Sequence, residues 1–97
     1  MTIYGITHRR LALKGVIVQV RCQVVDANRN LVGSAQEFTV PQAADMIEAG
    51  QVFELWPRIG AVRVSGGAVL ARREPDGTPR LVGERPAGHR LVDLPGF

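Results

Sequence analysis

The clearest pattern in the chain is an alternation of apolar and polar residues within positions 16–25. Valine or cysteine occupies every second position from Val16 to Val24, and Gln19, Arg21 and Gln23 lie on the opposite face. Such alternation is typical of a half-buried antiparallel strand, with one face toward the core and the other toward water. Residues 31–38 follow the turn-forming segment 26–30, so we expect them to return as the partner strand of a hairpin. Gly33 indicates either a bulge or a close backbone approach in that second strand.

A second pattern, over residues 39–50, predicts a helix. Thr39 and Gln42 have the spacing of a capping box, in which each side chain accepts a backbone N–H of the first turn. Pro41 fits that turn because its missing N–H has no partner to lose there, and Gly50 is a typical stop residue. Isolated helices shorter than about 12 residues are marginal in water, so this helix must pack on the strands. The apolar stripe that faces them consists of Val40, Ala43, Ala44 and Ile47.

Other segments have the composition of strands. Residues 1–10 and 52–56 are rich in β-branched and aromatic side chains, which favour extended backbone. The sequence Ser-Gly-Gly at 65–67 accepts the positive φ of a tight turn, so we expect a second hairpin between residues 59–64 and 68–72.

A turn and a tail follow. In Glu-Pro-Asp-Gly at 74–77, proline presets φ and glycine takes the position of positive φ. Residues 78–97 are rich in proline and glycine, which predicts a partly ordered tail without a long regular element. Short extended pieces at 80–82 and 90–94 are expected to dock on the body through Leu81, Leu91, Val92 and Leu94.

Together these elements predict an α+β fold, with a small, twisted, mostly antiparallel sheet of five or six strands and one short helix packed on one face. The helix joins an N-terminal meander to a C-terminal hairpin. We expect a single domain over residues 1–82 and a docked Pro/Gly-rich tail over residues 83–97. The predicted core consists of Val18, Val20, Cys22, Val24, Phe38, Ala43, Ile47, Phe53, Leu55, Val62 and Val64.

Length and composition narrow the class of protein. A chain of 97 residues is long enough for one hydrophobic core. Its single cysteine, Cys22, excludes an internal disulfide and lies in the apolar row, so we expect a buried, unreactive thiol. No segment approaches the roughly 18 apolar residues of a membrane span, and the N-terminus lacks the order of a signal peptide. We therefore expect a soluble, cytoplasmic protein.

Several short motifs resemble a family of short bacterial proteins of unknown function. They are the opening Ile6-Thr7-His8-Arg9, the helix end Ile47-Glu48-Ala49-Gly50 followed by Phe53, Val62-Arg63-Val64, Pro75-Asp76-Gly77-Thr78 and Leu91-Val92-Asp93-Leu94-Pro95. The resemblance spans nearly the whole chain, although residues 83–88 look like an insertion before the last motif. It implies a compact domain and no residue roles, because the family has no assigned activity.

The sequence offers no constellation for catalysis or metal binding. His8 and His89 stand at opposite ends of the chain, and with Cys22 they are too few for a zinc site. Neither serine stands in a nucleophile elbow. Asp45 and Glu48 lie on the outer helix face, where solvent keeps both carboxyl groups ionised. We therefore predict that the protein is not an enzyme and holds no metal, cofactor or small-molecule ligand.

The charge of the chain suggests two possible classes of partner. The chain has a formal net charge of +3, which suits either an acidic partner or ordinary solubility. Several arginines lie toward the two ends of the chain, where one sheet edge would gather them into a patch for nucleic acid. However, aromatic residues do not interleave with them as a stacking platform requires. The possible nucleic-acid contacts are Arg9, Arg10, Arg72, Arg73 and Arg80.

The preferred function is protein interaction or self-association, with a homodimer possible. A small sheet keeps at least two edges, and the long apolar strand at 16–25 needs a partner or a cover. Trp56 has the opposite parity to Phe53 and Leu55. It is expected either to lie exposed as an interface anchor or to pack under the tail. Arg21, on the polar face of its strand, is the second possible interface residue.

Overall fold

The structure is a computed structural model that describes residues 2–84 and 91–97. It confirms the α+β fold, with a six-stranded sheet and one helix packed against it. The elements are β1 (Ile3–Leu11), β2 (Ile17–Val25), β3 (Leu31–Thr39), α1 (Val40–Glu48), β4 (Val52–Leu55), β5 (Arg58–Ile59), β6 (Val62–Arg63), β7 (Ala68–Arg73), β8 (Pro79–Gly83) and a turn of 3-10 helix, η1 (Leu91–Asp93).

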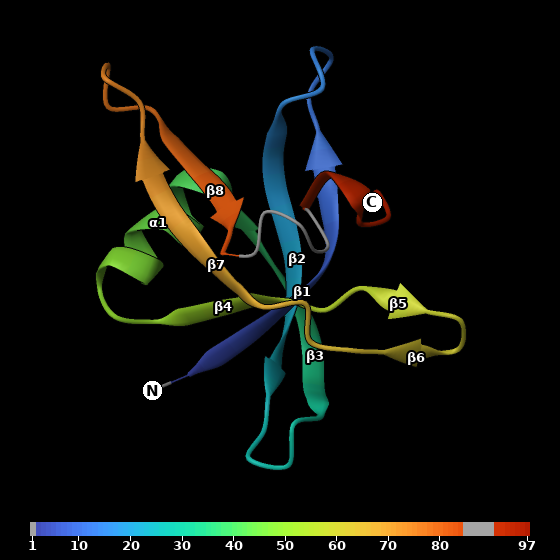
Figure 1. Cartoon of the computed structure of the whole chain (residues 1–97). Helices are drawn as coiled ribbons and strands as arrows, with labels where there is room; N and C mark the ends of the chain where they lie inside the picture. The colour runs from blue at the N-terminus through green and yellow to red at the C-terminus, as the bar shows by residue number, and fades with distance from the viewer. Residues whose placement is uncertain (1, 85–90) are drawn as a thin grey trace.

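The strand order of the sheet is β3-β2-β1-β4-β7-β8. The pair β1–β4 is parallel, and the other neighbours in this sheet are antiparallel. Strands β5 and β6 form a separate hairpin that projects from the body of the molecule (Figure 1). Helix α1 connects β3 to β4 and packs against strands from both halves of the sheet. Among the residues that the structure describes, no helix is long and apolar enough to cross a membrane.

The predicted meander β1-β2-β3 is confirmed, and local hydrogen bonds explain its turn. The Asp26 carboxylate accepts the backbone N–H groups of Asn28 and Asn30, each at 2.9 Å. Arg29 takes a positive φ of 62° within that turn. Gly33, with φ 76°, lies where the pairing of β2 with β3 shifts register. The predicted bulge is therefore present, and it interrupts the exposed edge of β3.

The helix begins as its capping box predicts. The Thr39 hydroxyl accepts the Gln42 backbone N–H at 3.2 Å, and the Gln42 side chain accepts the Thr39 backbone N–H at 2.8 Å. Gly50 follows the last turn with φ 103°, a conformation that glycine reaches without strain. The helix buries Val40, Ala43 and Ala44 completely or nearly so, which fixes its apolar stripe against the sheet.

The predicted hairpin between residues 59–64 and 68–72 is wrong. Strand β6 pairs with β5, whereas β7 pairs with β4 and β8. Gly60, with φ 63°, makes the tight turn between β5 and β6. The segment 65–67 runs alongside the end of β4, where Leu55 exchanges backbone hydrogen bonds with Gly66 and Gly67 at 2.6 and 2.9 Å. The β7–β8 hairpin uses the predicted turn at 74–77, with Gly77 at φ 89°.

The predicted core is partly correct. Val20, Cys22, Ala43, Phe53 and Leu55 are buried, and Phe38 and Ile47 pack against them. Further buried hydrophobic residues, which the prediction omitted, are Ile6, Val25, Val40, Ala44, Trp56, Val69, Leu91 and Leu94.

Three predicted core residues are instead exposed: Val18, Val62 and Val64. The β1–β2 register shifts between the pairs Arg10–Gln19 and Leu11–Ile17. Val18 is the extra residue of this irregularity, so Ile17 takes its place against the core. Val62 and Val64 lie on and beside the projecting β5–β6 hairpin, away from the helix.

The last described segment completes the core beyond the end of β4. Leu91 and Leu94 are 4% and 2% exposed. Arg9 donates its backbone N–H to the Pro95 carbonyl at 3.0 Å, and Gly96 pairs with Arg9 in parallel. This segment therefore occupies the edge of β1 that β4 leaves free after Ile6. Most of the predicted insertion at 83–88 lies outside the described residues. Outside them too are Arg85, His89 and Arg90.

Candidate anion-binding surface

The sheet face opposite the helix gathers cationic side chains from four elements. His8 on β1 pairs directly with Arg21 on β2, and Arg10 follows His8 at the next position on the same face. The Trp56 backbone N–H donates to the Ile6 carbonyl at 2.9 Å, so the β5–β6 hairpin that follows starts beside β1 and brings Arg58 and Arg63 near His8, on which both charges act. We call His8, Arg10, Arg21, Arg58 and Arg63 the basic surface.

Phe97 holds two of these arginines in place. The Arg10 guanidinium lies 4.5 Å from the centre of its ring, and the Arg21 guanidinium lies 4.3 Å from it. Arg10 also donates to the Phe97 carbonyl at 3.1 Å and to the Gln19 side chain at 2.8 Å. The ring attracts both cations through its quadrupole, so two like charges are held close together.

The hairpin carries a second pair of like charges. Arg58 stands directly opposite Arg63 in the β5–β6 pairing, an arrangement that destabilises a hairpin. Arg63 is anchored because its Nη1 donates to the Trp56 carbonyl at 2.8 Å. Burial, followed by the charge of Arg58, lowers the pKa of Arg63.

His8 lies among these charges and is half-buried. Burial is the largest cause that lowers the pKa of His8 from its ordinary value. The guanidinium charges of Arg63, Arg21 and Arg58 lower it further, in that order. The imidazole is therefore mostly neutral near pH 7 and remains so at more acidic pH than a free histidine.

Arg21 bears the one ion pair on this surface among the residues that the structure describes. Its guanidinium lies 3.1 Å from the Glu37 carboxylate. Arg10, Arg58 and Arg63 form no ion pair with the side-chain carboxylates that the structure describes. The basic surface therefore carries an excess of positive charge.

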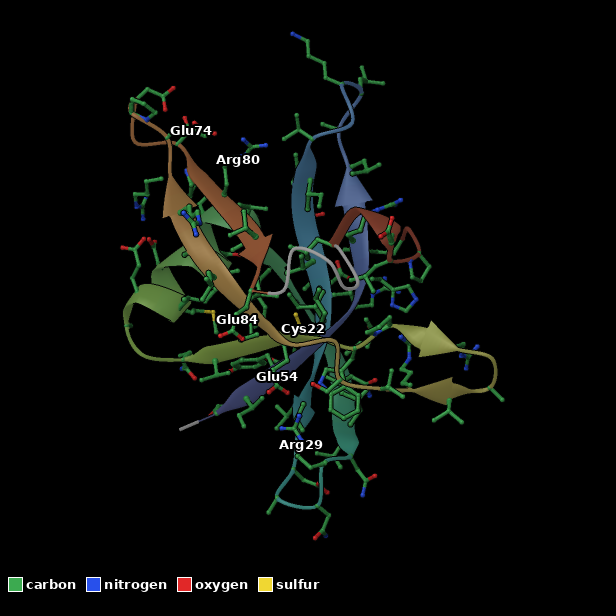
Figure 2. The ribbon with its side chains drawn as sticks, in the orientation of Figure 1. Cys22, Arg29, Glu54, Glu74, Arg80 and Glu84 are labelled. Atoms are coloured by element: carbon green, nitrogen blue, oxygen red, sulfur yellow. The ribbon has the colours of Figure 1, made fainter. Side chains whose placement is uncertain are left out.

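Trp56, a predicted interface residue, is 5% exposed, so its interpretation as an exposed anchor is wrong. Its indole N–H donates to Glu54 at 3.3 Å, and the Arg29 guanidinium lies 5.5 Å from its ring centre. Arg29 also forms an ion pair with Glu54 at 2.8 Å (Figure 2). The side chain packs under this pair and beside Leu31 and Gly5.

The five predicted nucleic-acid arginines lie in different places, and Arg10 alone among them belongs to the basic surface. Arg9 follows the alternation to the opposite face. Arg73 bridges Asp45 and Glu48 on the helix at 3.1 and 2.9 Å, and Glu48 raises its pKa. Arg80 pairs with Glu74 at 2.8 Å at the tip of β7–β8 (Figure 2).

Arg72 stands opposite Arg80 in the β7–β8 pairing. Sequence reasoning therefore found Arg10 and Arg21, the latter as an interface residue, but missed His8, Arg58 and Arg63 as members of one surface. The spacing around Gly60 was the available signal, because a two-residue turn there places Arg58 and Arg63 opposite each other.

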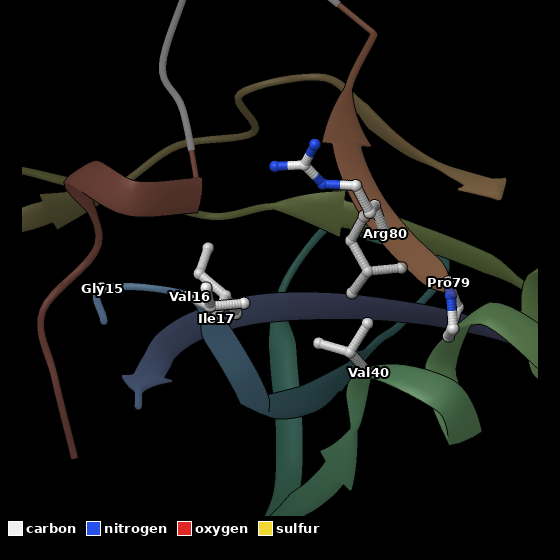
Figure 3. A pocket seen from close by; sticks show the side chains of 7 residues that line it. Gly15, Val16, Ile17, Val40, Pro79 and Arg80 are labelled. Carbon is white, nitrogen blue, oxygen red and sulfur yellow. The ribbon is translucent and has the colours of Figure 1, made fainter. Parts of the chain in front are cut away.

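A cleft of about 250 Å³ opens between the β1–β2 turn, the start of α1 and β8 (Figure 3). Its lining is largely aliphatic, and Arg80 is its charged residue. The residues that line it are Gly15, Val16, Ile17, Val40, Pro79, Arg80 and Leu81. The cleft thus presents apolar surface and one guanidinium, without a nucleophile or a carboxylate among these residues.

Cys22, the thiol of the chain, lies in the core. It is fully buried, and burial raises its pKa to about 12, as expected for a structural cysteine. Within residues 2–84 and 91–97, no three His, Cys, Asp or Glu side chains gather as metal ligands.

Comparisons with known proteins add no assignment. No family model matches the chain, and neither a curated protein nor a solved structure matches it significantly. The resemblance to a family of short bacterial proteins therefore stays a prediction.

Proposed function

We propose that this protein is a non-enzymatic interaction domain that binds an acidic protein partner through the basic surface. The observation that supports this function is the charge imbalance. Four arginines and one histidine occupy the surface, and its one ion pair among the described residues is Arg21 with Glu37. Arginine is enriched in protein interfaces because its planar guanidinium donates two parallel hydrogen bonds to one carboxylate.

Two features favour a protein over a nucleic acid. The Glu37 carboxylate at the margin of the surface is 46% exposed, and a discrete acidic side chain can be placed away from it, whereas the evenly spaced charges of a phosphate backbone cannot all avoid it. The Phe97 ring is engaged by two guanidiniums, so it does not offer a free face for stacking a base. The proposal includes the cytoplasm as the compartment, in agreement with a single buried, unpaired thiol.

The test uses charge reversal with a matched control. A fluorescent peptide of alternating glutamate and glycine serves as the acidic probe, and its anisotropy reports binding at low salt. Arg58→Glu removes a charge that has no ion pair among the described carboxylates, whereas Arg80→Glu makes the same charge change away from the basic surface. We expect about a tenfold weaker affinity for Arg58→Glu, equivalent to about 1.4 kcal/mol, and little change for Arg80→Glu. Equal losses in the two variants, or no binding by the wild type, would contradict the proposal.

Nucleic acid is the second candidate, and the β5–β6 hairpin favours it. This two-stranded ribbon projects from the body (Figure 1) and carries Arg58 opposite Arg63. A ribbon of two strands fits the major groove of duplex DNA. Binding of a labelled duplex that weakens steeply with salt and is lost in Arg58→Glu, without binding of the acidic peptide, would favour this candidate.

Self-association stays a prediction. A homodimer gives a sedimentation mass that rises with protein concentration. Because the basic surface would then face acidic groups of a second copy, Arg58→Glu is expected to lower that mass toward the monomer value.

A further inference from the structure

Several positive charges lie close together at the base of the β5–β6 hairpin. Arg58 and Arg63 stand opposite each other, and the Trp56 backbone N–H, which donates to the Ile6 carbonyl at 2.9 Å, holds the start of this hairpin beside β1. On β1, His8 pairs with Arg21. No carboxylate of the described residues forms an ion pair with Arg58 or Arg63. The segment 85–90, Arg-Pro-Ala-Gly-His-Arg, contains no acidic residue by sequence. A repulsive cluster of this kind is relieved when an anion binds.

The hydrogen bonds of His8 indicate which of its two ring nitrogens can gain a proton. Its Nδ1 lies 2.8 Å from the Thr7 hydroxyl, and that hydroxyl lies 3.3 Å from the Arg21 carbonyl oxygen. A carbonyl accepts and cannot donate, so the Thr7 hydroxyl donates to Arg21 and accepts the Nδ1–H of His8. This arrangement leaves Nε2 of His8 as the nitrogen that gains a proton.

Several parts of the cluster are held in position before any ligand arrives. Arg63 is anchored to the Trp56 carbonyl, and Arg21 is fixed between Glu37 and the Phe97 ring. Arg58 is exposed and free of ion pairs among the described carboxylates. Donors that are already oriented lose little conformational entropy on binding, which favours affinity.

We propose that His8, Arg21, Arg58 and Arg63 bind a phosphate group, and that its binding is coupled to uptake of a proton at Nε2 of His8. The inference rests on the proposed function and names its target as a phosphorylated side chain of the acidic partner. A phosphate monoester carries nearly two negative charges and three acceptor oxygens, which match three guanidiniums and an imidazolium better than one carboxylate does. Clusters of arginine are the general means by which proteins recognise phosphorylated segments.

Proton uptake follows from charge. In the free protein the three arginines disfavour the imidazolium form of His8. A bound dianion replaces this repulsion by attraction, so it raises the pKa of His8. A phosphate that stays dianionic therefore binds more tightly as the pH falls through that raised pKa, until protonation of the phosphate itself, with a second pKa of about 6 for a monoester, removes one of its charges.

The test follows the imidazole protons of His8 by NMR, with inorganic phosphate as the probe and sodium chloride at matched ionic strength as the reference. The His8 resonance is assigned from its loss in His8→Gln. We expect saturable binding and a rise in the His8 pKa of about one unit, which corresponds to about 1.4 kcal/mol of coupling. Arg58→Gln should abolish most of the rise, whereas Arg80→Gln, a matched neutralisation outside the basic surface, should preserve it.

Each outcome of this experiment either supports or contradicts the proposed phosphate site. A His8 pKa that is the same in phosphate and in chloride would overturn the inference, as would equal effects of Arg58→Gln and Arg80→Gln. A phosphoserine peptide that reproduces the His8 shift supports the named target. An oligonucleotide that produces the shift while the phosphoserine peptide does not would overturn it.

The failure of this inference is distinguishable from failure of the proposed function. Binding of the unphosphorylated glutamate peptide without any response to phosphate would overturn the phosphate site and leave the interaction domain supported. A response to inorganic phosphate without binding of either peptide would support the anion site itself, and would contradict both the interaction domain and the named target.

Discussion

At the residue scale, tight packing surrounds Gly5 on the face opposite the helix. Gly5 is buried in the middle of β1. A Cβ atom built there would lie 2.6 Å from Leu31 Cδ2 and 2.8 Å from Trp56 Cδ1, both far inside van der Waals contact. The absence of a side chain at Gly5 thus lets the Trp56 ring lie flat against the sheet under Arg29 and Glu54. This contact explains why Trp56 is not an exposed anchor.

We predict that Gly5→Ala lowers the free energy of unfolding by about 1–3 kcal/mol, the range for overpacking a well-packed site. Urea denaturation measures the change. The atom nearest to the added Cβ belongs to Leu31, at 2.6 Å, so Leu31→Ala in the same chain should recover part of the loss. A Gly5→Ala midpoint equal to that of the wild type would show that this contact is not tight.

His8 makes the stability depend on pH. Its folded-state pKa is lowered, so between that value and the unfolded value the unfolded chain binds more protons. Stability is therefore greatest above the unfolded pKa and is lost as the pH falls through it toward the folded pKa. We predict that the wild type loses more stability than His8→Gln between about pH 7.5 and pH 5.5, a window that brackets an ordinary histidine pKa. Stability at the two pH values is measured by urea denaturation. If the wild type and His8→Gln lose the same stability between them, the lowered pKa of His8 is contradicted.

At the element scale, local signals predicted the helix well and one hairpin badly. The helix is set by hydrogen bonds among Thr39 and Gln42, which lie within one turn and depend on no distant residue. The predicted hairpin instead depended on which of two glycine-containing segments, the one at Gly60 or the one at 65–67, makes the tight turn. Gly60 turns β5 back on β6, so the segment 65–67 is left to extend along β4.

We predict that Thr39→Ala destabilises the protein by about 1 kcal/mol, the usual effect of losing an N-cap oxygen. Thr39→Ser is the matched control because it keeps the hydroxyl that accepts the Gln42 N–H. The comparison is made by thermal or urea unfolding. Equal stabilities of the alanine and serine variants would mean that the capping box contributes nothing.

At the scale of the whole molecule, the last described segment lies against the first strand. The segment around η1 packs Leu91 and Leu94 into the same core as Phe53 and Ile6 and pairs with β1 beyond the end of β4. Phe97 then reaches the opposite face and contacts Arg10 and Arg21. The C-terminal segment thus contributes both to the core and to the basic surface.

We predict that Leu94→Ala costs about 2–5 kcal/mol, as for other large aliphatic side chains in a core. Val62→Ala is the control, because Val62 is 61% exposed and surface substitutions usually stay within about 0.5 kcal/mol. Chemical denaturation of both variants gives the comparison. Similar values for the two would show that Leu94 is not part of the core.

The sequence by itself determined the features that nearest neighbours decide. These are the alternating strands, the capped helix, the turns at 26–30 and 74–77, and the burial of Cys22, because short-range hydrogen bonds and side-chain periodicity suffice for each. Tertiary structure decided which strands pair, how Trp56 is covered, and where the arginines gather. A single-residue irregularity exposes Val18, and a tight turn at Gly60 brings Arg58 and Arg63 to His8. Such outcomes depend on register between segments far apart in the chain, and this register is a property of the assembled sheet.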